Sequence, residues 1–150
     1  MTRPLRLAGH PLHPLLVHFP IALWTVGVAA DAAGWISHAT LWWLISFGSQ
    51  ALGSALGIVA ILAGFLEYAT LKRVHAAQDT AVQHMMIMCS AWLLFLISLA
   101  LRGLPEGQTP SPWATVVAAG GFVAMIWGGW LGGQLVYRFG VGTKAHCASE

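Results

Sequence analysis

Long apolar runs separated by short polar segments dominate the chain. Four of them exceed the roughly 18 residues that indicate a membrane-spanning helix, and they cover about residues 15–36, 41–68, 81–101 and 113–136. Only 8% of the residues are charged and the mean hydropathy is +0.71, whereas a soluble domain carries about 25% charged residues. The pattern therefore predicts one all-α domain over residues 1–150, an up-and-down transmembrane bundle of four helices.

The few charged residues predict how the bundle is oriented. Basic residues precede the first run, separate the second from the third, and follow the fourth: Arg3, Arg6, Lys72, Arg73, Arg138 and Lys144. An even number of spans places these three regions on one side of the membrane, and positive residues mark the cytoplasmic side. We therefore expect both termini to be cytoplasmic. The net charge of +2 is too small to indicate nucleic-acid binding.

Two local patterns predict irregular points in the first and third helices. Pro20 has no backbone N–H and should kink the first helix near Leu16. Thr80 and Gln83 fit the pattern of an N-terminal capping box. The third helix is therefore expected to begin near Ala81.

Asp31 lies inside the first apolar run. An ionised side chain in hydrocarbon is costly and usually has a partner. Arg102, at the end of the third run, lies near the same side of the membrane. We expect the two residues to form a structural ion pair.

Small residues recur at short intervals in the second and fourth runs. They are Gly53, Gly57, Ala60 and Gly64, and then Gly121, Gly128, Gly129, Gly132 and Gly133. Such faces let membrane helices pack closely, within one chain or between subunits, and this is the interpretation that we prefer. They would also leave space for a flat macrocycle. The sequence shows no convincing internal repeat.

Six of the seven histidines fall at the predicted cytoplasmic edge: His10, His13, His18, His75, His84 and His146. His18 and His84 lie in the first turns of apolar runs, where an ionisable side chain usually has a function. The first and third helices of a bundle can face each other diagonally, and cofactor sites in bundles use facing helices. We therefore expect His18 and His84 to be the axial ligands of a haem b near the cytoplasmic face.

Further candidates surround this pair. His13 is one of them. His75 is another, but nine residues separate it from His84, so the two lie on opposite sides of any continuous helix. A haem also needs cations for its propionates. The candidates on this edge are Arg6, Arg73 and Arg138.

Two other functions remain open. A transition-metal ion, such as zinc, copper or iron, would suit a site of imidazole and carboxylate ligands. Such a metal-binding or transport site would use His18 and His84, or alternatively His10, His13 and Glu67. The other open function is that of a structural partner subunit without a cofactor, which would form homo- or hetero-oligomers through its glycine-rich faces. In that case the histidines lie at the membrane interface, and Glu67 pairs with Lys72 or Arg73.

Both ends of the chain resemble a known family. G-H-P-L-H-P-L-L-V-H-F-P-I-A-L, Gly9–Leu23, resembles the opening of the bacterial domain of unknown function 2231 family, and G-G-Q-L-V-Y-R-F-G-V-G, Gly132–Gly142, resembles its closing segment. His84 matches a histidine of that family, while Glu67 stands where an aspartate is more usual. The resemblance implies a multi-pass protein of the inner membrane with haem or quinone chemistry. The chain would then be an electron-transfer subunit rather than a complete enzyme. Its partner would be a quinone or a redox protein.

Overall fold

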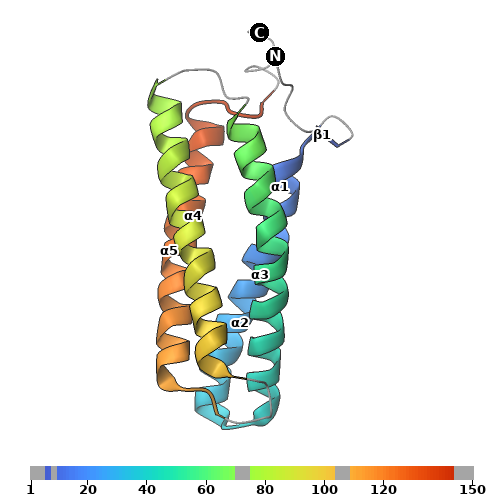
Figure 1. The fold of residues 1–150 in the computed structure, drawn as a ribbon, viewed down its shortest axis with the longest axis vertical. Coiled ribbons are helices and arrows are strands. Elements are labelled where there is room, and N and C mark those ends of the chain that lie inside the picture. Colours follow the sequence, from blue (N-terminus) through green and yellow to red (C-terminus); the bar gives the residue numbers. More distant parts are fainter. Residues whose placement is uncertain (1–5, 8–9, 70–74, 104–108, 144–150) are drawn as a thin grey trace.

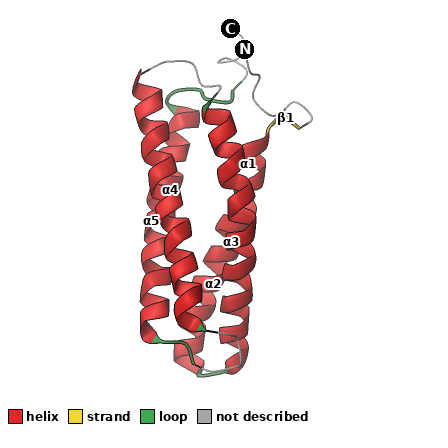
Figure 2. Cartoon of the chain, in the orientation of Figure 1, coloured by secondary structure: helices red, strands yellow, loops and turns green. Residues whose placement is uncertain are grey.

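The computed structural model describes residues 6–7, 10–69, 75–103 and 109–143, and only the backbone of residues 6, 7, 10, 75 and 76. Most of these residues lie in α1 (Leu12–Leu16), α2 (His18–Ser37), α3 (Thr40–Tyr68), α4 (His75–Arg102) and α5 (Pro112–Tyr137). A pair of two-residue antiparallel strands, β1 (Arg6–Leu7) and β2 (His10–Pro11), precedes the helices. The helices form an up-and-down bundle (Figure 1, Figure 2).

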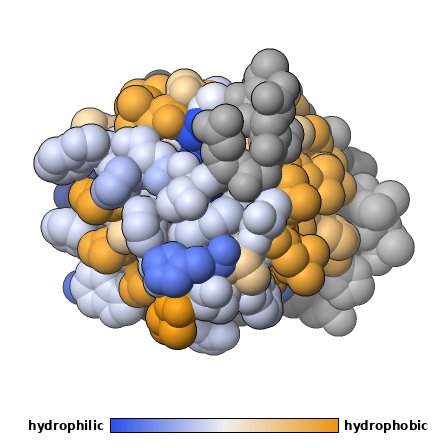
Figure 3. Space-filling model, turned by 90° about the horizontal axis from the view of Figure 1, so that it is seen from below, coloured by the Kyte–Doolittle hydropathy of each residue, from blue (hydrophilic) through white to orange (hydrophobic). Residues whose placement is uncertain are grey.

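Four stretches of the described chain are long and apolar enough to cross a membrane. They are Leu12–Ser37, Thr40–Tyr68, Ala77–Arg102 and Pro112–Tyr137. Seen along the bundle from below, pale and blue residues occupy the middle of the end face, and orange residues lie at several places around its rim (Figure 3). A polar end face with apolar residues at its rim is what a bilayer requires of a helical bundle. The predicted all-α bundle of four spans is confirmed.

The bundle consists of two helical hairpins. α2 packs mainly on α3, and α4 packs mainly on α5, while the α3–α4 and α2–α5 interfaces are smaller. We call the surface between the two hairpins the seam. We call the end at which α1 and α4 begin the histidine end, and the end at which α2 and α4 terminate the loop end (Figure 1). Residues 13 and 84 lie near the histidine end.

The first span is interrupted at Val17, which separates α1 from α2. Pro20 has no N–H to donate to the carbonyl of Leu16. The N–H of Ile21 still donates to the carbonyl of Val17, at 3.2 Å, so the helix resumes at once. The irregularity that Pro20 predicts near Leu16 is confirmed, one residue further on.

The prediction that the third span begins near Ala81 is wrong, because α4 begins at His75. Ala77 and Ala81 are only 3% and 6% exposed. The first turns of α4 therefore pack against the bundle, and this tertiary contact extends the helix past the capping pattern at Thr80. Since α4 is continuous from His75 to Arg102, positions 75 and 84 lie on opposite sides of it, as the separation of nine residues predicts for a continuous helix.

The core is built around two aromatic rings. Trp24 of α2 and Phe95 of α4 stack with ring centroids 4.7 Å apart and planes 9° apart. Ala91, Ala118 and Met125 surround them and are buried. This stack joins the two hairpins at the centre of the seam.

Candidate functional site

His13 is held tightly by its own hairpin. Its Nδ1 lies 2.8 Å from the carbonyl oxygen of Ala60 on α3. A carbonyl oxygen only accepts hydrogen bonds, so Nδ1–H donates and Nε2 carries the lone pair of the neutral ring. The ring also lies against Gly64, where an added Cβ would be 3.0 Å from Cε1. The glycine therefore lets the imidazole approach the backbone of α3.

His84 repeats this arrangement in the second hairpin. Its Nδ1–H donates to the carbonyl of Gly128 on α5 at 2.7 Å. The ring lies against Gly132, one turn further along α5, where a Cβ would be 3.1 Å from Cε1. The tautomer is again set by the carbonyl, and Nε2 again keeps its lone pair.

The two imidazoles meet at the seam. The ring centroids of His13 and His84 are 6.3 Å apart and the ring planes are 83° apart. The hydrogen bond described for each ring runs through Nδ1, to a carbonyl of its own hairpin. A histidine that binds a metal commonly donates its other ring N–H to a carbonyl or carboxylate. The pair therefore has the hydrogen bonding that prepares two imidazoles to act as metal ligands.

His18 lies on the exposed side of α2, so the prediction that it points into the bundle is wrong. The residue that meets His84 is His13. Buried Trp24 and Asp31 mark the inward face of the first span. His13 precedes Trp24 by eleven positions and lies about 20° from it around a helix, whereas His18 precedes it by six positions and lies about 120° away.

The remaining predicted site residues are only partly described. The side chains of Arg6, His10 and His75, and all of Lys72, Arg73 and His146, lie outside the described residues. Arg138 is exposed just beyond α5, with its guanidinium 5.3 Å from the centre of the Phe139 ring. Glu67 is half-buried near the end of α3 and has a hydrogen-bonding or electrostatic contact of its own. Among the residues that the structure describes, no group of three or more His, Cys, Asp or Glu side chains is placed to hold a metal ion.

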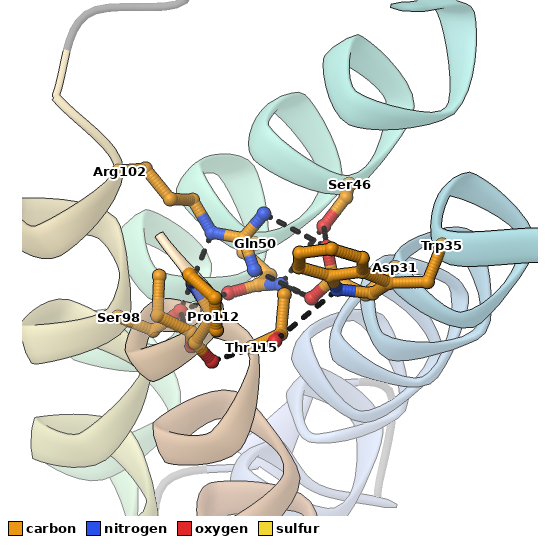
Figure 4. Close-up of polar contacts among 9 residues, drawn as sticks. Asp31, Trp35, Ser46, Gln50, Ser98, Arg102, Pro112 and Thr115 are labelled. Carbon is orange, nitrogen blue, oxygen red and sulfur yellow. Dashed lines mark hydrogen bonds and ion pairs between the residues drawn. The ribbon is translucent and has the colours of Figure 1, made fainter. Parts of the chain in front are cut away.

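A second polar centre lies towards the loop end (Figure 4). The guanidinium of Arg102 donates to both carboxylate oxygens of Asp31, with 2.8 Å between Nη1 and Oδ1. Ser46 Oγ and Gln50 Nε2 also donate to this carboxylate, at 2.6 and 3.2 Å. Ser98 accepts from Arg102 Nε at 3.3 Å and lies within reach of Gln50 Oε1. The predicted Asp31–Arg102 ion pair is confirmed, and its side chains are only 6% and 3% exposed.

The two hairpins place equivalent residues in contact across the seam. The pairs, each separated by 71 positions, are His13 and His84, Trp24 and Phe95, and Asp31 and Arg102. Within each hairpin, a glycine packs against the aromatic ring, since Gly53 lies against Trp24 and Gly121 lies against Phe95. The constant separation of 71 positions follows from α2 and α4 running in the same direction through the bundle. Of the three pairs, only the histidine pair has the same residue on both sides.

The glycine-rich faces of α3 and α5 serve close packing inside the bundle, as preferred from the sequence. A Cβ on Gly53 would be 2.9 Å from Trp24 Cδ1, and one on Gly57 would be 3.0 Å from Trp92 Cδ1. Aromatic and imidazole rings therefore fill the space beside these glycines. Gly129 is different, because a Cβ there would meet nothing within 4 Å.

Substitution of the two glycines beneath the imidazoles should disturb the site. Gly64→Ala and Gly132→Ala would place a methyl group 3.0 and 3.1 Å from Cε1 of His13 and His84. Overpacking of this kind costs about 1–3 kcal/mol, and the ring must move away from its carbonyl partner. We expect both variants to lower the free energy of unfolding measured by denaturant titration in detergent.

Matched controls exist on the same helices. Gly48 on α3 and Gly129 on α5 have no atom within 4 Å of an added Cβ. Because alanine is the better helix former, Gly48→Ala and Gly129→Ala should be neutral or slightly stabilising. Equal losses in all four variants would contradict the packing described here.

A bundle of four apolar helices whose buried polar groups meet along one seam is the architecture of a multi-pass membrane protein. From residue 9 to residue 145, the chain matches the family described as "Predicted membrane protein (DUF2231)", and it belongs to that family. This confirms the resemblance seen at the two ends of the sequence. No curated protein and no solved structure matches the chain.

Proposed function

We propose that the protein is a membrane-embedded electron-transfer protein that binds haem b through His13 and His84. One observation carries the proposal: two imidazoles from different hairpins meet with centroids 6.3 Å apart, and a backbone carbonyl holds Nδ1–H of each ring. This leaves one Nε2 lone pair on each ring. The donor set therefore fits a metal centre that takes two neutral nitrogen ligands.

The two rings lie near enough to each other to serve one metal. Their centroids are 6.3 Å apart, and His13 and His84 would each hold the metal through Nε2, because Nδ1–H of each ring is already bonded to a carbonyl. Two imidazoles are the protein ligands that a bis-histidine haem needs, whereas a structural metal ion usually takes four ligands.

The chain's own residues hold and shield this site. Ala60 and Gly128 orient the two imidazoles through their carbonyls, and the stacked Trp24 and Phe95 form the buried core further along the bundle. Arg138 is exposed beyond α5 and available to a propionate carboxylate, while Arg6 and Arg73 stay predicted partners. When bound, haem supplies one-electron chemistry, and a quinone or a redox protein is the proposed partner.

A single transition-metal ion on the same two Nε2 atoms is the second candidate. The observation that favours it is the filling of the glycine-rich faces by side chains. The space beside α3 and α5 that the glycine-rich sequence predicts for a macrocycle is therefore partly occupied by side chains. An ion needs none of that room.

The test is a visible spectrum of the protein purified in detergent, recorded oxidised and reduced, with metal analysis of the same sample. We expect a Soret band and sharp α and β bands on reduction, with about one iron per chain. A colourless protein with stoichiometric metal would support the second candidate. A colourless protein without metal, also after incubation with haemin and with zinc or copper salts, would reject both.

A further inference from the structure

The separation of the two imidazoles depends on how the hairpins are placed. The His13 ring is bonded to α3, and the His84 ring is bonded to α5. Each ring also lies directly against a glycine of its own hairpin. Because neither ring is free to adjust by itself, the distance between them follows the relative position of the two hairpins. Residues that fix the seam therefore fix the site.

Apart from the His13–His84 contact itself and the approach of Gly142 to Pro11 at the histidine end, the described hydrogen bonds and ring contacts across the seam lie in the middle of the bundle and towards the loop end. Trp92 Nε1 donates to the carbonyl of Ser54 at 2.9 Å, and the Trp24–Phe95 stack lies one turn away. The Asp31–Arg102 pair is the contact with the strongest directional preference, because a guanidinium binds a carboxylate through two parallel hydrogen bonds. It therefore restrains both the distance and the twist between the hairpins.

The ion pair also shares one helix face with the histidines. Asp31 lies seven positions after Trp24 and eighteen after His13, so the three fall within about 20° of one another around a helix. Phe95 and Arg102 have the same spacing from His84. The three residue pairs therefore lie in layers along one axis, with the imidazoles at one end and the ion pair at the other. A shift of the hairpins at one layer is transmitted to the others.

We propose that Asp31 and Arg102 are positioning residues for the His13–His84 site. The ion pair sets the relation between the two hairpins, and this relation brings the imidazoles to a separation at which they share one ligand. The inference rests on the proposed role of the two histidines as ligands. Its test uses a distance that can be measured whether or not haem is bound.

The experiment measures distances between nitroxide labels in the full chain by pulsed electron resonance. One label replaces Leu66 on α3 and the other replaces Met86 on α4; both positions are exposed and near the histidine end. Cys89 and Cys147 are changed to serine in every sample. In Asp31→Asn and Arg102→Gln, we expect the distribution between labels 66 and 86 to broaden or shift. Arg102→Lys, which keeps the charge, should give an intermediate distribution.

A second label pair separates positioning from simple stability. Labels at exposed positions 86 and 123 lie within the second hairpin, so their distance should stay as in the parent protein. Ser90→Ala is the control, because Ser90 is exposed and bonds only within its own helix. An unchanged 66–86 distribution in Asp31→Asn and Arg102→Gln would overturn the inference, and so would an equal disturbance of both label pairs. A colourless protein would reject the haem proposal but would leave this comparison intact.

Discussion

His13→Ala and His84→Ala should each reduce haem affinity by more than about tenfold, since even residues that only orient a metal ligand contribute about 10–100-fold. Each substitution removes one of the two Nε2 lone pairs offered at the seam. The remaining imidazole is still held by its own hairpin and cannot move across to replace the other. Titration of the purified variants with haemin, followed by the Soret band, measures the effect.

His18→Ala is the matched control. His18 lies five residues from His13, on the exposed side of α2, and its loss should leave the titration unchanged. The opposite result, with His18 required and His13 dispensable, would restore the ligand pair expected from the sequence and reject the one proposed from the structure.

Removal of one partner of the buried ion pair should cost about 3–5 kcal/mol of stability, because the other charge is left buried and unpaired. The variants are Asp31→Leu and Arg102→Leu, at side chains that are 6% and 3% exposed. The double variant should recover most of the loss, since a well-packed apolar pair is often as stable as a buried ion pair. The free energy of unfolding in mixed detergent micelles is the measurement.

Ser98→Ala serves as the comparison within the same network. Ser98 touches Arg102 and Gln50 but carries no charge, so its loss should cost only about 0.5–1.5 kcal/mol. If Asp31→Leu and Arg102→Leu cost no more than Ser98→Ala, the pair does not hold the seam as described.

The spans and the ion pair could be predicted from the sequence, whereas the inward histidine could not. Runs of apolar residues specify membrane helices by length alone, and a carboxylate in such a run requires a partner. The sequence favours His18 because it lies in the first turn of an apolar run. This criterion fails because the face of the helix decides which side chain enters the bundle. The useful signal was the spacing of His13 from Trp24 and Asp31, which recurs after His84.

The start of α4 shows a second limit of local patterns. Thr80 and Gln83 form a capping pattern, yet the helix begins five residues before Thr80, at His75. The buried faces of Ala77 and Ala81 stabilise the extra turns, and helices in proteins gain most of their stability from such packing. The residues around Thr80 do not by themselves predict such a tertiary contact, so they do not predict where α4 begins.

The hydrogen bonds of Asp31 bear on how the chain is inserted during synthesis. Arg102 follows Asp31 by 71 residues, so the carboxylate enters the bilayer well before its cationic partner leaves the ribosome. Ser46 and Gln50, which already donate to it, belong to the same hairpin as Asp31. The nascent first hairpin can therefore hydrogen-bond the Asp31 carboxylate with its own side chains. Arg102 adds its ion pair to these hydrogen bonds only after the third span has been synthesised.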